Sequence, residues 1–127
     1  MKARRRQRPE DDLQRAVVEM AGWFYPRLFV FHPPNGGART AAEAGVFKAL
    51  GVRAGVPDLI VLGPGAVVGF LELKAPGGRL SPWQEHCMDV LEKMGFFVWV
   101  VRSVDQAVDA FDWIERESAR RRSEGHE

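Results

Sequence analysis

The stretch from Pro57 to Gly78, PDLIVLGPGAVVGFLELKAPGG, constrains the fold of this chain more than any other. Two apolar segments rich in β-forming residues flank a Gly-Pro-Gly turn, and this pattern predicts a hairpin of two buried strands. The same stretch carries three ionisable side chains, those of Asp58, Glu72 and Lys74. Burying an unpaired ion costs several kcal/mol even after relaxation, so these charges need partners.

The hairpin geometry brings the three charged side chains together. Because side chains alternate along a strand, Glu72 and Lys74 share one face, while Leu71 and Leu73 point the other way into the core. Asp58 begins the neighbouring strand, beside the C-terminal end of the second strand. We therefore expect the three ionisable groups to converge at one edge of the sheet.

Two explanations for this charged cluster are open from these residues alone. Two carboxylates a few ångströms apart repel each other, which raises the pKa of one of them. A divalent cation removes that cost, and magnesium is held by one or two carboxylates, waters and phosphate oxygens. Lys74 would then stabilise a phosphate or position the attacking water. The alternative is a structural network of ion pairs, which is a common feature of proteins.

Apolar periodicity and turn residues divide the chain into eight elements. We expect helices at 10–23, 40–50, 81–94 and 103–117, and strands at 28–32, 58–62, 67–74 and 96–101. The resulting order, α-β-α-β-β-α-β-α, predicts an α/β fold with a small mixed β-sheet flanked by helices. Ser81 and Gln84 have the spacing of a capping box at the start of the third helix. The last strand is continuously apolar, as is typical of a strand covered on both faces.

The charge of the chain is divided between an acidic body and two basic ends. The 127 residues suffice for one domain with a core, and the formal net charge is +1. Lys2–Arg8 holds five basic residues and no acid, and Arg116–Arg122 holds four basic residues and one acid. Residues 10–115 hold nine basic and 14 acidic residues. We therefore predict a basic arm at 1–9, one domain at 10–115 and a charged tail at 116–127. The ends are either solvated tails or sites that capture a polyanion.

Several other classes of protein are disfavoured. No apolar run approaches eighteen residues, so we expect no membrane span. The single cysteine, Cys87, rules out an internal disulfide and suits the cytoplasm. The chain shows neither zinc-ligand spacing nor a nucleotide-binding glycine motif. A structural role is favoured over DNA contact for His32, and we expect Trp83, Trp99 and Trp113 to belong to the core.

The spacing of the charged residues resembles a known nuclease signature. Pro-Asp, thirteen intervening residues and then Glu-x-Lys across a hairpin match the PD-(D/E)xK pattern. The segments that extend this match are EDDLQRAVV, FHPPNGGAR, GVRAGVPDLIVL, LELKAPGGRLSPWQ and VWVVRSVDQAVDAF. Together they resemble the virus-type replication-repair nuclease (VRR-NUC) domain over roughly residues 10–112. The resemblance implies a restriction-endonuclease-like core and phosphodiester hydrolysis that depends on Mg²⁺ or Mn²⁺.

The resemblance also implies the residues of the site. Asp58, Glu72 and Lys74 would be catalytic. The metal site would be formed by Glu10, Asp58, Glu72 and the main-chain carbonyl of Leu73. Glu10 best matches the glutamate on the first helix of the family, although Asp11 and Asp12 lie close enough to keep that assignment open.

Further residues are candidates for orienting the site and binding DNA. Gln84 matches a glutamine of the family that orients the site, but its position in the capping box offers a second explanation, and both stay open. The glycine-rich loops are suited to close approach to a phosphate backbone, and the candidate DNA contacts on these loops are Asn35, Arg39, Arg53 and Arg79. Ordinary turns with solvated side chains are the alternative for each of these four residues.

By this resemblance, we expect a DNA endonuclease of replication, recombination or repair in the cytoplasm of a bacterial or phage-infected cell. Stand-alone members of the family resemble Holliday-junction resolvases, which implies a homodimer that acts on branched DNA. The alternatives are a flap- or nick-directed nuclease with the same chemistry and a non-catalytic DNA-binding module that keeps the fold.

Overall fold

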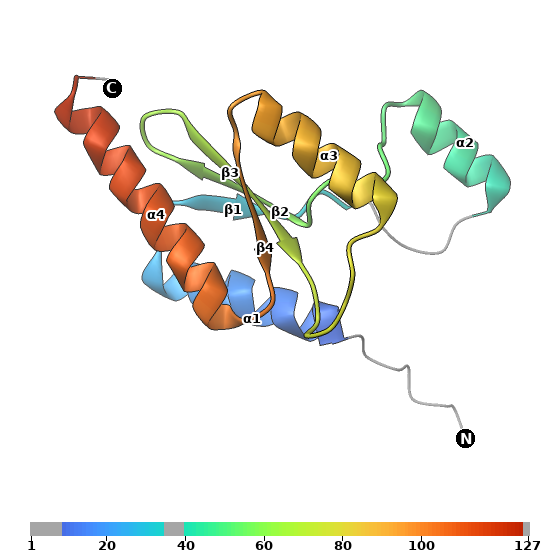
Figure 1. Cartoon of the computed structure of the whole chain (residues 1–127), viewed down its shortest axis with the longest axis horizontal. Coiled ribbons are helices and arrows are strands. Elements are labelled where there is room, and N and C mark those ends of the chain that lie inside the picture. The colour runs from blue at the N-terminus through green and yellow to red at the C-terminus, as the bar shows by residue number, and fades with distance from the viewer. Residues whose placement is uncertain (1–8, 35–39, 126–127) are drawn as a thin grey trace.

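The computed structural model describes residues 9–34 and 40–125, which contain four helices and four strands (Figure 1). The helices are α1 (Pro9–Phe24), α2 (Ala41–Ala49), α3 (Pro82–Lys93) and α4 (Val104–Ser123). The strands are β1 (Phe29–Phe31), β2 (Leu59–Gly63), β3 (Val67–Leu73) and β4 (Phe97–Val101). The predicted order of the elements is confirmed.

The four strands form one mixed sheet in the order β1-β2-β3-β4. β1 pairs with β2 and β2 with β3 in antiparallel fashion, whereas β3 and β4 are parallel. The predicted hairpin is therefore the centre of the sheet. Leu59 pairs with Leu71, so Asp58, one residue earlier, lies across from Glu72.

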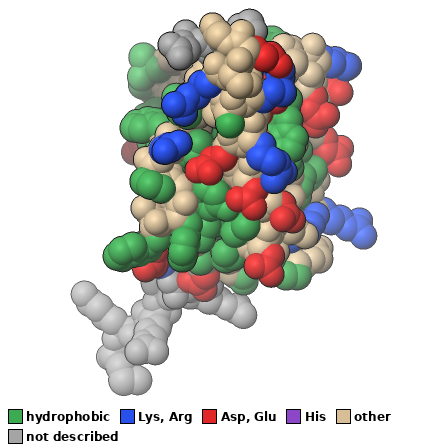
Figure 2. Space-filling model, turned by 90° about the vertical axis from the view of Figure 1, so that its left-hand side faces the viewer, with side chains coloured by type: hydrophobic (Ala, Val, Ile, Leu, Met, Phe, Trp, Pro, Cys, Tyr) green, Lys and Arg blue, Asp and Glu red, His purple; other side chains and the backbone are tan. Residues whose placement is uncertain are grey.

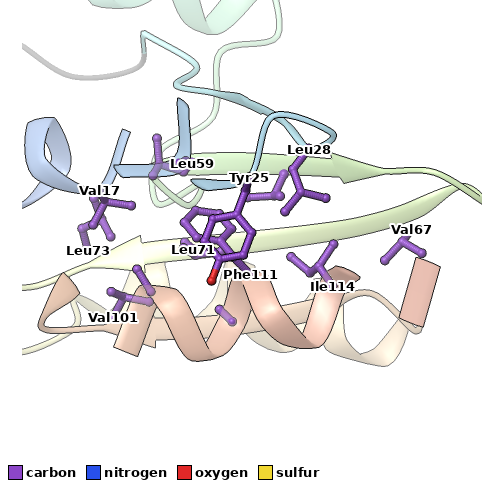
Figure 3. Close-up of a cluster of buried hydrophobic side chains, with 14 residues drawn as sticks. Val17, Tyr25, Leu28, Leu59, Val67, Leu71, Leu73, Val101, Phe111 and Ile114 are labelled. Atoms are coloured by element: carbon purple, nitrogen blue, oxygen red, sulfur yellow. The ribbon is translucent and has the colours of Figure 1, made fainter. Parts of the chain in front are cut away.

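The hydrophobic core lies between the sheet and the helices α1 and α4 (Figures 1 and 3). Leu59, Leu71 and Leu73 come from the sheet and are fully buried against Phe111 and Ile114 of α4. Complete burial of one such side chain contributes roughly 1.5–3 kcal/mol to folding. α3 packs against β4 on the other face of the sheet. The alternation of β3 therefore directs its leucines into the core and Glu72 toward α3.

Helix α4 is longer than the sequence predicted. Its apolar periodicity fades near Glu117, where we expected it to end, but the helix continues to Ser123. Arg121 explains part of the extension, because its Nη1 donates to the carbonyl oxygens of Gly65 and Ala66, each at 3.0 Å. These bonds attach the last turns of α4 to the β2–β3 turn. Such a tertiary contact has no signature in local periodicity.

Of the expectations about apolar residues, the one for β4 is supported and the one for Trp83 is wrong. β4 is an edge strand whose first four residues are half-buried, but it contacts α4 on the core side of the sheet and α3 on the other side, which agrees with a strand covered on both faces. Trp83 is 66 % exposed at the start of α3, where it lies outside the core. Trp99 and Trp113 are partly buried and pack against the core, and Phe97 lies 4.2 Å from Trp113 between ring centroids.

Helix α2 is held by local signals more than by packing. Thr40 caps it and forms a capping box with Glu43. All of its residues are exposed, and it packs against no other described helix or strand. Figure 1 shows it at one end of the molecule, away from the sheet.

No helix in the described part of the chain is long and apolar enough to cross a membrane.

Candidate active site

Asp58 is positioned by the loop that precedes β2. Gly55 has φ +82°, and a Cβ atom there would lie 2.4 Å from the backbone oxygen of Trp83, so only glycine lets the loop pack against the start of α3. Asp58 follows this loop, and its Oδ2 accepts a hydrogen bond of 2.8 Å from the backbone N–H of Leu73. The aspartate is thereby attached to β3 between Glu72 and Lys74.

His32 holds the main chain of the same aspartate. Its Nδ1 lies 2.6 Å from the carbonyl oxygen of Asp58. A carbonyl oxygen only accepts, so Nδ1 carries the proton and donates it. This contact supports the structural role expected of His32.

Glu72 is the most buried charged side chain of the described structure, at 1 % exposure. Burial raises its pKa, and so do the charge of Asp58 and hydrogen bonding to Asp58. Lys74 acts in the opposite direction and Glu10 adds a smaller increase, so that the pKa of Glu72 rises to about 9. In the absence of a cation, Glu72 is therefore protonated near neutral pH.

One oxygen of Glu72 meets a hydrogen-bond donor and the other meets none among the described residues. Gln84 Nε2 donates to Glu72 Oε1 at 3.2 Å. Glu72 Oε2 is buried and meets no hydrogen-bond donor among the described residues, and the hydrogen bonding to Asp58 requires that Glu72 carry a proton. A buried acceptor without a partner is unusual in proteins and indicates that a proton, a water or an ion completes it.

Gln84 makes the contacts that both alternatives require, one at the helix cap and one with Glu72. Its Oε1 accepts from the backbone N–H of Ser81 at 2.8 Å, which completes the capping box of α3. Its Nε2 is free for Glu72 because the two ends of an amide are different groups. The helix cap therefore fixes the side chain that touches the glutamate.

Lys74 lies at the end of β3 and is only 8 % exposed. Its backbone N–H donates to the carbonyl oxygen of Val101 at 3.0 Å, which extends the pairing with β4 by one residue. Its side chain lowers the pKa of Glu72, so the ammonium group acts on the carboxyl pair. Asp58, Glu72 and Lys74 therefore lie at the same end of the hairpin, as predicted, but among the described residues no salt bridge joins Lys74 to either acid.

The three acids of the first helix have different surroundings. Glu10 contributes to the raised pKa of Glu72, and a Cβ on Gly78 would lie 3.7 Å from Glu10 Oε1. Asp11 lines a hollow of about 510 Å³ between α1 and β1. Asp12 is exposed, and its Oδ1 lies 3.9 Å from Nη1 of Arg15. Glu10 is thus the acid that acts on the carboxyl pair.

The carboxyl pair suits a divalent cation, although the third acid stands apart. Within residues 9–34 and 40–125, no three side chains of His, Cys, Asp or Glu are close enough to form a ready-made metal site. The structure brings together Asp58 and Glu72, with Glu10 farther away. The oxygen donors and the unpartnered Glu72 Oε2 fit a hard cation such as Mg²⁺, which keeps several waters as ligands.

Two of the four predicted DNA contacts belong to the described residues, and both lie on loops that border the site. Arg53 precedes Asp58 on the loop at 51–57, and Arg79 follows Lys74 on the loop at 75–80, and both are exposed. Asn35 and Arg39 lie outside the described residues.

One residue near the site was missed by the sequence analysis. Arg102 Nη1 donates to the carbonyl oxygens of Ala75 at 3.1 Å and Gly78 at 2.7 Å. The signal in the sequence was a single arginine between an apolar strand and the helix cap Ser103. Nothing in that pattern indicates a partner 24 to 27 residues earlier in the chain.

A mixed four-stranded sheet flanked by helices, with Asp and Glu-x-Lys at the end of its central hairpin, defines an α/β fold of the restriction-endonuclease type. The family model of the VRR-NUC domain matches residues 28–105. The chain therefore belongs to the VRR-NUC domain family, a family of nuclease domains. Nuclease domains of this PD-(D/E)xK type typically use divalent metals.

Solved structures agree with this fold. A chain described as a VRR_NUC domain protein has a TM-score of 0.68 and 24 % sequence identity, with 87 % of this chain and 90 % of that chain covered. A second chain, described as a VRR_NUC domain, has a TM-score of 0.57 and 24 % sequence identity, with 81 % of this chain and 94 % of that chain covered. Among the curated proteins, none matches significantly. At this identity the structural likeness supports the fold, and the family match supports the nuclease class.

Proposed function

We propose that this protein is an endonuclease that hydrolyses phosphodiester bonds of branched DNA with Mg²⁺ or Mn²⁺ as its cofactor. The observation that carries the proposal is the buried carboxyl group of Glu72, whose pKa is raised by burial and by the neighbouring charge of Asp58, in the same region as the buried residue Lys74. In a purely structural ion-pair network, we would expect each buried carboxylate oxygen to have a donor, but Glu72 Oε2 meets none among the described residues.

Asp58 and Glu72 would hold the cation together with the main-chain carbonyl of Leu73, and Glu10 would complete the set. When bound, the cation supplies a Lewis acid for the phosphate and lowers the pKa of a bound water. Other residues of the chain would orient these two carboxylate ligands. The Leu73 N–H holds Asp58, and Gln84 holds Glu72.

Lys74 would act on the phosphate or on the attacking water. Its ammonium group has three donors, its charge lowers the pKa of Glu72, and the residue is only 8 % exposed. In such a position a fixed charge stabilises developing negative charge more strongly than it does in water.

DNA would be held by its phosphates. Arg53 and Arg79 border the site, and we propose Asn35 and Arg39 as further donors. Residues 10–115 carry more acidic than basic residues, so the basic ends would contribute much of the attraction to DNA.

We further propose a homodimer, because two sites related by a two-fold axis suit paired cuts across a four-way junction. Large apolar side chains are exposed on β1 and at α2, and a dimer interface would bury some of them. Phe29 is 66 % exposed, Val46 59 % and Leu50 75 %.

The experiment that tests the function is a panel of labelled four-way junction, flap, nicked and linear DNA, incubated with Mg²⁺, Mn²⁺ or EDTA. We expect metal-dependent cutting with preference for the junction, and a dimer by light scattering at micromolar concentration. Binding without cutting under every metal condition would instead indicate a DNA-binding module. Equal cutting of all four substrates would contradict the selectivity but keep the chemistry.

A further inference from the structure

Arg102 connects the end of β4 to the loop that follows the Glu-x-Lys segment. Its Nη1 donates to Ala75 O at 3.1 Å and to Gly78 O at 2.7 Å. The Gly78 N–H also donates to Ala75 O at 2.9 Å, so the loop closes on itself around the same carbonyl. Hydrogen bonds from a charged donor are stronger than those between neutral groups. The half-buried guanidinium group therefore acts as a clamp on residues 75–78.

The base of this clamp is itself fixed. The backbone N–H of Arg102 donates to Gln106 Oε1 at 2.6 Å, and the N–H of Gln106 donates to Ser103 Oγ at 3.2 Å. One residue earlier, Val101 O accepts from the Lys74 N–H at 3.0 Å. Arg102 thus projects from a rigid corner between β4 and α4, which can hold a loop in one position.

The clamped loop borders three groups of the proposed site, those of Lys74, Gln84 and Glu10. It begins directly after Lys74 and ends at Ser81, the cap of α3 that places Gln84 against Glu72. At its middle, a Cβ on Gly78 would be 3.7 Å from Glu10 Oε1. A displacement of this loop would therefore move both the glutamine that orients Glu72 and the backbone beside the helix-one glutamate.

We propose that Arg102 is a positioning residue of the nuclease site, whose guanidinium group holds the loop at 75–80 so that Glu10 and Gln84 stay in place around Glu72. This inference rests on the proposed function. Arg102 touches neither the carboxyl pair nor, in this role, the DNA. Its loss should affect cation binding and turnover more than DNA affinity.

The test compares Arg102→Met with Arg102→Lys, which keeps a cationic donor. Arg15→Met is the control, because it removes an exposed arginine from the helix that carries Glu10. Three quantities are measured: the Mn²⁺ affinity of DNA-free protein by calorimetry, kcat and KM on junction DNA, and thermal unfolding. For Arg102→Met we expect Mn²⁺ affinity and kcat each to fall about tenfold, the lower end of the range for direct partners of metal ligands, because Arg102 acts through the loop. KM should change less than about threefold, and Arg102→Lys should restore part of both losses.

A folded Arg102→Met protein with the Mn²⁺ affinity and kcat of Arg15→Met would overturn this role while leaving the nuclease proposal intact. An increase in KM alone would also overturn it, since that would make Arg102 a DNA contact. If Arg102→Met does not unfold cooperatively, Arg102→Gln is used, because its shorter neutral amide cannot reach both carbonyls. Wild-type Mn²⁺ affinity in that variant would equally contradict the role. A wild-type protein that neither binds Mn²⁺ nor cuts would refute the proposed function itself.

Discussion

At the scale of single residues, the site depends on one carboxyl group that is costly to ionise. Glu72 is buried beside Asp58, and its pKa rises from 4.5 to about 9. The folded protein therefore binds more protons at this site than the unfolded chain between these two pH values. It follows that the stability contributed by Glu72 falls as the pH rises through this window in the absence of a cation. A cation bound at the site would replace the proton and remove this cost.

Replacement of Glu72 by glutamine should stabilise the metal-free protein. The amide mimics the protonated carboxyl group: it can accept from Gln84 and donate to Asp58. We expect Glu72→Gln to raise the free energy of unfolding by roughly 1–3 kcal/mol at pH 8, with a smaller gain at pH 5. Urea denaturation at both pH values, with EDTA present, measures this. A gain independent of pH would show that Glu72 does not titrate in this window.

Lys74 tests whether the charged cluster is catalytic or structural. Lys74→Ala should lower the cleavage rate by about two orders of magnitude, the scale for loss of one preorganised charge. Calorimetric Mn²⁺ affinity should change little by comparison, because lysine is no ligand. Normal turnover combined with a large loss of thermal stability would instead identify Lys74 as part of a structural ion-pair network.

At the scale of the elements, the hairpin and the order of helices and strands could be predicted because apolar periodicity and turn residues are local signals. The convergence of Asp58, Glu72 and Lys74 followed from strand alternation and hairpin geometry. Tertiary contacts could not be predicted. The extension of α4 depends on Arg121 reaching the β2–β3 turn. Gln84 was left with two competing roles, since the sequence does not show that the amide end opposite the cap faces Glu72.

The two roles of Gln84 can be separated by comparing it with Ser81. Ser81→Ala should cost about 1 kcal/mol of stability through removal of the cap, with cleavage nearly unchanged. Gln84→Ala should lose similar stability, but its cleavage rate should fall a further 10- to 100-fold because Glu72 loses its donor. Chemical denaturation and single-turnover cleavage measure the two effects. Equal cleavage rates for both variants would mean that the contact with Glu72 has no role in the reaction.

At the scale of the whole molecule, charge is distributed unevenly along the chain, but its basic C-terminal end is partly neutralised. Arg120 pairs with Glu117 and Glu124, and Arg121 also pairs with Glu117. On the side shown in Figure 2, acidic and basic side chains are interspersed with apolar ones. The N-terminal segment, with five basic residues and no acid from Lys2 to Arg8, is therefore the stronger candidate for attraction to DNA.

Deletion of residues 2–8 should weaken DNA binding in a salt-dependent manner. The slope of log affinity against log salt concentration should shrink by up to about 0.9 for each DNA phosphate that the shortened protein no longer neutralises. The control replaces Arg116 and Arg122 by alanine, and we expect a smaller change in slope from it. Turnover of bound DNA should persist, since no proposed site residue lies in the deleted segment. An unchanged slope would mean that the segment is only a solvated tail.

The central claim is that Asp58 and Glu72 jointly bind the cation that supports DNA cleavage. The most direct measurement is single-turnover cleavage of a four-way junction in Mg²⁺ by the wild type, Asp58→Asn and Glu72→Gln, at protein concentrations that saturate binding. Both substitutions keep side-chain volume but remove the charge of a ligand. We expect cleavage by the wild type, none in EDTA, and loss of cleavage in both variants while they remain folded and bind the junction. Cleavage at the wild-type rate by either variant would contradict the assignment of the site.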